Sequence, residues 1–267
     1  MTNLNLETVI ISTDGRGVAT LTLNRPEKHN ALDGAMIADL RQAAAVLGAD
    51  DDVRVVVLTN AECSSFCAGG DVNWFKSMAD ANRSTRRNGS RELAQMFADL
   101  DRLPKPLIGR IEGSAYGGGI GMISVCDYSV GVIGAQYGLT EVRLGLIPAN
   151  ISPYVVKRIG ELNARAVMLS GALFDADRAV QIGLLTEAVA AADLDARVEK
   201  IVLDHLEAAP GAVAMTKELI SFVSTHGHDD NLLYTGDRLA DAWETEEGAA
   251  GIIAFLGKTL PPWRNRK

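Results

Sequence analysis

The chain is poor in aromatic residues and in cysteine, and both shortages exclude classes of function. Only 5% of its 267 residues are aromatic, which argues against a stacking platform for single-stranded nucleic acid. Its three cysteines, Cys63, Cys67 and Cys126, form no CxxC pair. We therefore expect neither a disulfide framework nor a zinc site or other metal site, and we predict free thiols in a reducing, cytoplasmic compartment.

An excess of basic residues and long apolar runs are also missing. The sequence has 26 Lys and Arg against 34 Asp and Glu, a net charge of -8, so it should repel phosphate polymers and we expect no nucleic acid partner. A small anion can still bind at a local basic patch or a helix N-terminus. No apolar run approaches the roughly 18 residues of a membrane span, and the N-terminal segment lacks the features of a secretory signal. We expect no membrane partner.

Apolar periodicity predicts strands that alternate with helices over the first two-thirds of the chain, and helices alone after that. The predicted strands are 7–13, 18–24, 53–59, 107–111, 127–133 and 184–189. The predicted helices are 34–48, 73–103 with a break near 81–89, 118–125, 193–208, 211–225, 230–244 and 246–257. This order favours the α/β class with crossover connections. We expect a core over 1–192 and a helical region over 193–267, which must bury its apolar faces on the core or on a neighbouring subunit.

Three consecutive glycines, Gly117–Gly119, separate a strand-like run from a helix-like run. They do not form a phosphate-binding P-loop, because Ile120 and Gly121 follow where Lys and Ser or Thr are needed. A dinucleotide fingerprint fails at Met122, and a nucleophile elbow fails at Glu112, where it requires glycine. Close helix–strand packing or a backbone binding site remains.

A second segment of small residues, FCAGGD at 66–71, follows the strand 53–59 much as the glycine run follows 107–111. Two such segments can each direct one backbone N–H group at a single point, which is the arrangement of an oxyanion hole. The glycine run also opens a helix, whose N-terminal partial charge favours a developing anion. The sequence therefore predicts a backbone site for an oxyanion.

Five segments together resemble the enoyl-CoA hydratase/isomerase, or crotonase, superfamily. They are LNRPEKHNAL (23–32), FCAGGD (66–71), EGSAYGGG (112–119), EVRLGLIP (141–148) and EGAAGIIAFLGK (247–258). The resemblance implies a crotonase fold, a spiral of β-β-α units with a C-terminal helical trimerisation region. It also implies a homotrimer or homohexamer and an acyl-CoA thioester substrate, with coenzyme A as part of the substrate and no separate cofactor.

Within this resemblance, the catalytic positions are Glu141, Ala68 and Gly118. The backbone N–H groups of Ala68 and Gly118 would hold the thioester carbonyl oxygen, and Glu141 would be the acid/base. Typical hydratases carry a second glutamate where this chain has Gly121. The chain thus supplies one carboxylate for a reaction in which hydratases commonly use two.

The resemblance further implies that substrate or CoA contacts come from Lys28, Ala31, Ala68, Gly69, Gly70, Asp71, Gly118, Phe255 and Lys258. We expect Asp71 to brace its loop by accepting backbone hydrogen bonds. Phe255 and Lys258 would reach the CoA site of a neighbouring subunit. Arg25 and Lys28 either face the CoA phosphates or are solvated loop charges. Residues 74–78, with two aromatic side chains, either line the acyl group or pack ordinarily.

The stretch LGLIPANISPYVVKRIG (144–160) is most similar to hydratases of methylglutaconyl-CoA and isohexenylglutaconyl-CoA. We therefore favour water addition to a branched or carboxylated α,β-unsaturated acyl-CoA. The alternatives are a Δ3,Δ2-enoyl-CoA isomerase with Glu141 as sole proton shuttle, another thioester lyase, and a catalytically silent acyl-CoA binder. A dienoyl-CoA isomerase is disfavoured, because its extra aspartate would fall at Ala149.

Overall fold

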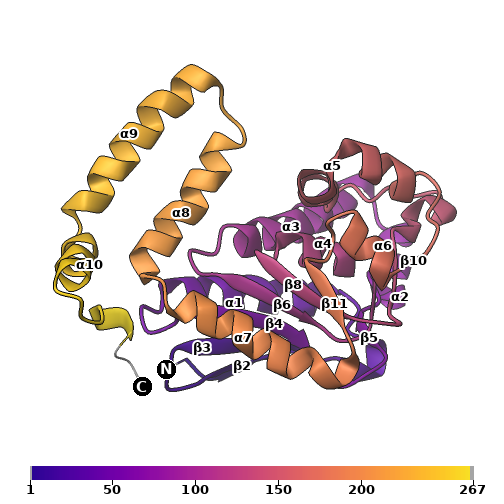
Figure 1. Ribbon diagram of the computed structural model, residues 1–267. Coiled ribbons are helices and arrows are strands. Elements are labelled where there is room, and N and C mark those ends of the chain that lie inside the picture. The colour runs from indigo at the N-terminus through magenta and orange to yellow at the C-terminus, as the bar shows by residue number, and fades with distance from the viewer. Residues whose placement is uncertain (1, 265–267) are drawn as a thin grey trace.

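The computed structural model describes residues 2–264, and its core is a seven-stranded sheet (Figure 1). The strand order is β1-β2-β3-β4-β6-β8-β11. The strands are β1 Leu4–Asn5, β2 Val9–Thr13, β3 Val18–Leu23, β4 Val55–Asn60, β6 Leu107–Ile111, β8 Tyr128–Val132 and β11 Glu187–Val189. Pairing is antiparallel from β1 to β3 and parallel from β3 to β11. The six strands predicted from periodicity are all present.

Local sequence explains the central strands. The backbone N–H of Gly17 donates to the Asp14 carbonyl in the turn between β2 and β3, and Gly17 takes the positive φ of 84° that an L side chain disfavours. In β4 every residue is buried. This matches the run of β-branched and apolar residues over 55–59, since a parallel strand covered on both faces has no polar side.

A second, four-stranded sheet has the order β10-β9-β7-β5 and was not predicted. Its strands are β5 Ser65–Cys67, β7 Ser114–Tyr116, β9 Gln136–Gly138 and β10 Phe174–Asp175. Along the chain β4 leads to β5, β6 to β7 and β8 to β9, and each pair is followed by helix. This repeat is the spiral of β-β-α units that the sequence resemblance implied. The second sheet sets the starting points of the segments that carry the predicted site.

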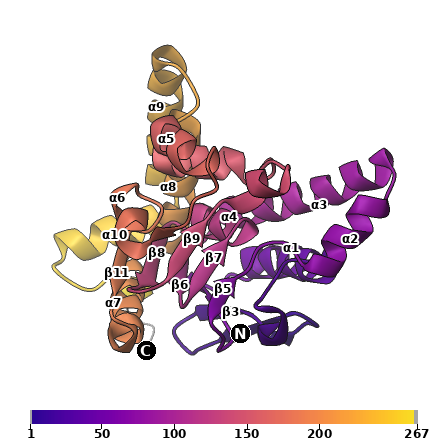
Figure 2. The same ribbon diagram turned by 90° about the vertical axis from the view of Figure 1, so that its right-hand side faces the viewer.

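Seven α-helices accompany the described sheets (Figure 2). They are α1 Gly34–Ala49, α2 Val72–Asp80, α3 Arg83–Asp101, α4 Gly118–Val125, α5 Ser152–Met168, α6 Ala176–Gln181 and α7 Leu194–Leu206, with 3-10 turns η1 Pro26–Lys28, η2 Thr140–Leu144 and η3 Ala191–Asp193. The predicted break in 73–103 falls at 81–82, where the Asn82 side chain accepts a hydrogen bond from Thr85 N and caps α3. Gly160, at φ 74°, breaks α5 into two pieces.

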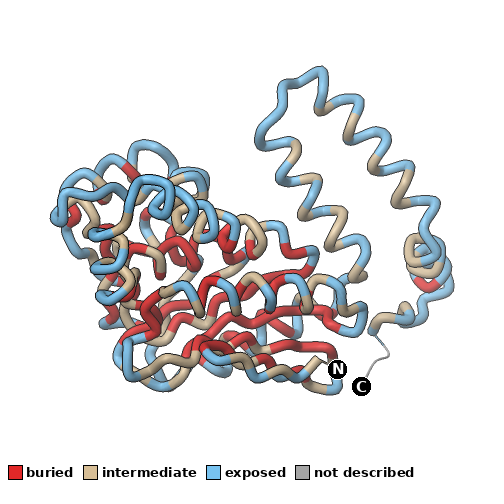
Figure 3. The backbone as a smooth tube through the Cα atoms, turned by 180° about the vertical axis from the view of Figure 1, so that it is seen from behind, coloured by how far each residue is buried: buried red, intermediate tan, exposed pale blue. Residues whose placement is uncertain are grey.

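Three further helices stand away from the core: α8 Pro210–Val223, α9 His228–Glu244 and α10 Glu246–Leu256 (Figures 1 and 3). The last turn, η4 Pro262–Arg264, returns to the core, where the Trp263 carbonyl accepts a hydrogen bond from Arg54. In contrast to the projecting helices, α7 packs on β6 and β8 and buries Val198 and Ile201. We therefore propose that the boundary between core and projecting helices lies after α7 instead of at residue 192. Among residues 2–264, no helix is both long enough and apolar enough to span a bilayer.

Candidate active site

Glu141 lies against the glycine run, although the two are more than twenty residues apart. It belongs to η2, which follows β9 directly, and Gly145 closes that turn in the left-handed region at φ 73°. A Cβ atom placed on Gly117 would lie 2.8 Å from Glu141 Oε1. Gly117 also has a positive φ of 48°. The first glycine of the run is therefore required both by its backbone and by the carboxyl group beside it.

The Glu141 carboxyl has no charged partner within the described chain. Its Oε2 atom is buried and accepts no hydrogen bond from residues 2–264. Burial raises the pKa of Glu141, and a hydrogen bond from its own backbone offsets part of that rise. A lone carboxyl group with a raised pKa, next to a backbone site, can take up and return a proton.

Two backbone N–H groups near this carboxyl are free to donate. Gly118 is the first residue of α4, where N–H groups lack intrahelical acceptors, and its N–H has no partner among the described residues. The N–H of Gly70 likewise has none there. The N–H of Ala68 instead donates to the His29 carbonyl oxygen at 3.0 Å. The expectation for Ala68 is corrected on this point: its N–H is already used, and Gly70 is the candidate donor.

Leu32 brings the two glycines together. Its N–H donates to the Gly69 carbonyl at 2.7 Å and its carbonyl accepts from Asp71 N at 2.8 Å, so its backbone brackets Gly70. Its side chain reaches the other loop, because a Cβ on Gly118 would lie 2.5 Å from Leu32 Cδ1. Gly70 and Gly118 thus both adjoin one residue, as two converging donors would.

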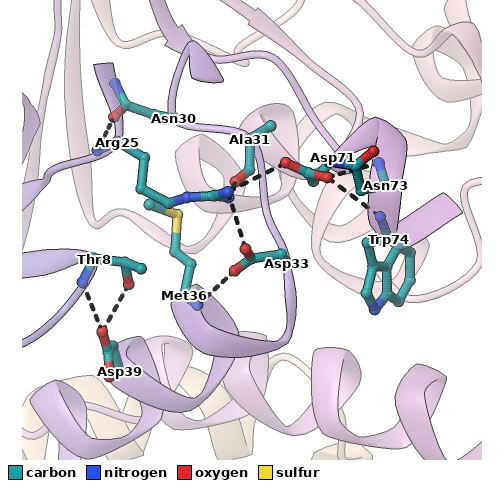
Figure 4. Close-up of polar contacts among 10 residues, drawn as sticks. All are labelled: Thr8, Arg25, Asn30, Ala31, Asp33, Met36, Asp39, Asp71, Asn73 and Trp74. Carbon is teal, nitrogen blue, oxygen red and sulfur yellow. Dashed lines mark hydrogen bonds and ion pairs between the residues drawn. The ribbon is translucent and has the colours of Figure 1, made fainter. Parts of the chain in front are cut away.

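Arg25 and Asp71 fix the segment that carries Gly70 (Figure 4). The Arg25 guanidinium is 3.0 Å from Asp33 and 3.2 Å from Asp71, and it donates to the Ala31 carbonyl at 2.6 Å. Asp71 caps α2 by accepting from the N–H groups of Asn73 and Trp74. Arg25 therefore points inward, and it does not face a CoA phosphate. Asp71 makes the bracing hydrogen bonds that we expected of it.

The pKa of Asp71 reflects this network. Burial alone would raise it, but the hydrogen bonds from the Trp74 and Asn73 backbone and from Arg25 outweigh burial and lower it. Asp71 is thus held as an anion in a structural role, whereas burial keeps Glu141 ready to accept a proton. The two carboxyl groups of the site have opposite shifts and different tasks.

Apolar side chains occupy the place of the second glutamate. A Cβ on Gly121 would lie 2.4 Å from Ile151 Cγ2 and 2.8 Å from the ring of Phe97. Both side chains are buried, with exposed fractions of 3% and 0%. The atoms nearest to this position are thus all apolar, and a carboxyl side chain has no room there.

The remaining predicted contacts are spread over the molecule. Lys28 is exposed at the end of η1, and Ala31 is buried beside Arg25. The ring of Phe75 lies 2.7 Å from a Cβ placed on Gly70. Phe255 and Lys258 are exposed on and after α10. In both views α10 lies at the opposite side of the molecule from α2 (Figures 1 and 2). The structure does not bring Phe255 and Lys258 together with Glu141 in one chain.

Other chemistry near the site is limited. Burial raises the pKa of the Cys67 thiol to about 12, so this cysteine is not a nucleophile. Residues 2–264 hold no cluster of three or more potential metal ligands. Two grooves, of about 460 and 530 Å³, lie elsewhere, one between β2, β3 and α7 and one between α1 and the end of α3. Neither includes a predicted site residue.

Sequence reasoning missed Leu32, Phe97 and Ile151 as parts of the site. Each is an ordinary apolar residue whose importance comes from a contact with a distant glycine. For Gly70, the signal was its place in FCAGGD, and only the bond from Ala68 to His29 separates the two candidate donors.

Comparison with known proteins identifies the family of the chain. The model of the enoyl-CoA hydratase/isomerase family matches residues 13–266. The (E)-benzylidenesuccinyl-CoA hydratase of Thauera aromatica is 33% identical, over 92% of this chain and 95% of that protein. An enoyl-CoA hydratase from Shewanella pealeana has a similar structure, with a TM-score of 0.93, 33% identity and 97% of each chain covered. Pseudomonas aeruginosa AtuE gives a TM-score of 0.93 at 34% identity, over 97% of this chain and 100% of AtuE. The chain has the crotonase fold and belongs to the enoyl-CoA hydratase/isomerase family.

Proposed function

We propose that this enzyme adds water reversibly to an α,β-unsaturated acyl-CoA thioester. The observation that carries the proposal is the single buried carboxyl of Glu141, which lies against the glycine run next to the free N–H groups of Gly118 and Gly70. The names of its full-length relatives support the same chemistry.

In the proposed reaction, Gly118 and Gly70 donate hydrogen bonds to the thioester carbonyl oxygen. Glu141 takes a proton from a water molecule as the water oxygen bonds to Cβ. The electrons of the double bond move to the carbonyl oxygen, and the two donors stabilise the resulting enolate. Glu141 then returns its proton to Cα. One water is thus added, with hydroxyl at Cβ and hydrogen at Cα, and one carboxyl group performs both transfers.

We further propose that the acyl group is branched or carries a second carboxylate, in the manner of methylglutaconyl-CoA. The resemblance of residues 144–160 to hydratases of such substrates supports this. The name of the benzylidenesuccinyl-CoA relative also describes a thioester with a second carboxylate.

A Δ3,Δ2-enoyl-CoA isomerase is the second candidate, and the filled position at Gly121 favours it. Moving a double bond requires proton removal at one carbon and return at another, which one carboxylate can do. In that case the same N–H donors would hold the enolate, but no water would be incorporated.

We propose that the enzyme is cytoplasmic and assembles as a homotrimer or as a hexamer of two trimers. The projecting helices expose large apolar side chains, with Trp243 61%, Phe255 79% and Leu256 74% exposed. Such a surface suits a subunit interface, which would bring Phe255 and Lys258 to a neighbouring CoA site. All three cysteines are free thiols, which suits a reducing compartment. Light scattering should give three or six times the chain mass of 28.4 kDa, and a monomer would contradict the proposed assembly.

The catalytic proposal is tested by comparing Glu141→Gln with Glu112→Gln. Glu112 is a matched control, because it pairs with Arg110 at 2.6 Å outside the site. Loss of the conjugated double bond of 3-methylglutaconyl-CoA is followed by ultraviolet absorbance. Removing an acid/base should lower kcat by about 10²–10⁴, and the control should retain activity. Equal activity of the two variants would refute the role of Glu141. Tight binding without any turnover by the wild type would instead indicate a silent binder.

A further inference from the structure

A polar contact joins α3 to the segment between η2 and α5, and neither the family resemblance nor the proposed reaction uses it. Ser90 Oγ on α3 donates a hydrogen bond to Asn150 Oδ1 at 2.9 Å, in the segment between η2 and α5. Both residues are half-buried. The Asn150 Nδ2 group has no acceptor among the described residues, so the pair presents an amide donor whose oxygen is already held.

The contacts of α4 locate this pair relative to the catalytic carboxyl. Glu141 Oε1 lies at Gly117, and Ile151 lies at Gly121. Gly117 is the N-cap of α4, and its carbonyl accepts a hydrogen bond from Gly121 N at 3.1 Å, so the two glycines are one helical turn apart along α4. Asn150 immediately precedes Ile151, so it belongs to the segment that packs on α4 one turn further along than Glu141 does.

The other member of the pair approaches from the same side. Ser90 lies seven residues, or two helical turns, before Phe97 on α3, so the two share a face of that helix. Phe97 is the ring that touches the Gly121 position together with Ile151. Ser90 thus lies two turns along α3 from Phe97, and Asn150 is next in sequence to Ile151; these are the two apolar side chains that stand where a second glutamate would be.

With the thioester oxygen held at Gly118, as proposed, the double bond would lie beside Glu141. An acyl chain that extends from there along α4 would reach the segment between η2 and α5, where Asn150 offers its amide. The N–H groups of this amide can donate to an oxygen acceptor such as a carboxylate, because a hydrogen bond to a charged group is stronger than one between neutral groups.

We propose that Asn150, oriented by Ser90, is a specificity-determining residue that donates a hydrogen bond to an oxygen carried by the acyl chain beyond its double bond. The site then prefers a thioester with a terminal carboxylate to its hydrocarbon counterpart. The inference rests on the proposed placement of the thioester at Gly118 and Glu141, but it does not require that hydration follows.

The test measures binding of two saturated thioesters, which cannot be hydrated, by calorimetry. They are 3-methylglutaryl-CoA and 3-methylpentanoyl-CoA, in which a methyl group replaces the terminal carboxylate. The wild type should bind the first about 10-fold or more tightly than the second. In Asn150→Leu, which keeps the size but not the donor, this ratio should fall close to one. Ser90→Ala should lower the ratio several-fold by freeing the amide to rotate.

Asn163→Leu is the matched control, because Asn163 donates to the Ile159 carbonyl within α5 and should leave the ratio unchanged. A wild type without preference, or an Asn150→Leu variant that keeps it, would overturn the proposal. So would an equal loss for both ligands, which would indicate a structural role. Since binding alone is measured, failure of hydration leaves this test intact, and a preserved preference with no hydration would count only against the proposed reaction.

Discussion

Replacing Gly121 by alanine should destabilise the enzyme, although alanine is the better helix former. Alanine is favoured over glycine in a helix interior by about 1 kcal/mol. At Gly121, however, the new Cβ would lie 2.4 Å from Ile151 Cγ2 and 2.8 Å from the Phe97 ring. Overpacking of a core costs about 1–3 kcal/mol. The two effects together predict a free energy of unfolding lowered by up to about 2 kcal/mol.

Gly236→Ala in α9 is the control, because nothing lies within 4 Å of a Cβ at that position. It should gain about 0.5–1 kcal/mol. Both variants are compared with the wild type by urea unfolding followed by circular dichroism, at one protein concentration because assembly affects stability. Truncating Ile151 to alanine should make room for the new Cβ, with a coupling energy of about 1–2 kcal/mol. If Gly121→Ala gained stability as Gly236→Ala does, position 121 would be open and the argument for a single carboxylate would fail.

Three further predictions concern the site. Gly118→Pro removes the N–H donor at a helix position that tolerates proline, and it should lower kcat by about 10²–10³. Gly118→Ala adds the same Cβ but keeps the N–H, so its kcat should fall much less. Equal losses of kcat in the two variants would refute the role of the Gly118 N–H as a donor. Burial raises the pKa of Glu141 above its usual value of 4.5, and the reaction needs the Glu141 anion. A plot of kcat/KM against pH should therefore rise with a midpoint above 4.5. A midpoint at or below that value would contradict the burial of this carboxyl. Arg25→Met should lower the free energy of unfolding by about 2–4 kcal/mol. The pKa of Asp71 is lowered in the folded protein, so the stabilisation by its carboxylate is present above the unfolded-state pKa and is lost as pH falls through the folded-state pKa. The free energy of unfolding of Arg25→Met in urea should therefore depend less on acid pH than that of the wild type. An unchanged dependence would contradict the pairing of Arg25 with Asp71.

Much of the fold could be predicted because its largest elements have strong local signals. The strand 55–60 is a buried β-branched run, and the turn at Asp14–Gly17 contains the glycine that its backbone requires. The strands β5, β7 and β9 have three residues each. They are too short to show a period, so their small residues predicted loops. Their pairing depends on distant strands and could not be found locally.

The residues of the site also divide into those that the sequence predicts and those that it does not. The glycine run and Glu141 were found from composition and from a family resemblance. Which of Ala68 and Gly70 is the free donor depends on the His29 carbonyl, which accepts the hydrogen bond from Ala68 N. His29 has a positive φ, and nothing in the sequence predicts that conformation. The packing at Gly121 depends on side chains from α3 and from the start of α5, which meet only in the folded chain.

The most direct test of single-carboxylate hydration is mass spectrometry of the product from 3-methylglutaconyl-CoA in ¹⁸O-labelled and in deuterated water. The account predicts a product heavier by one water, with the heavy oxygen in the Cβ hydroxyl and one deuterium at Cα. It also predicts that Glu141→Gln slows the uptake of both labels by the same factor of about 10²–10⁴. A product without added oxygen, with deuterium exchanged and the double bond moved, would contradict hydration and identify an isomerase.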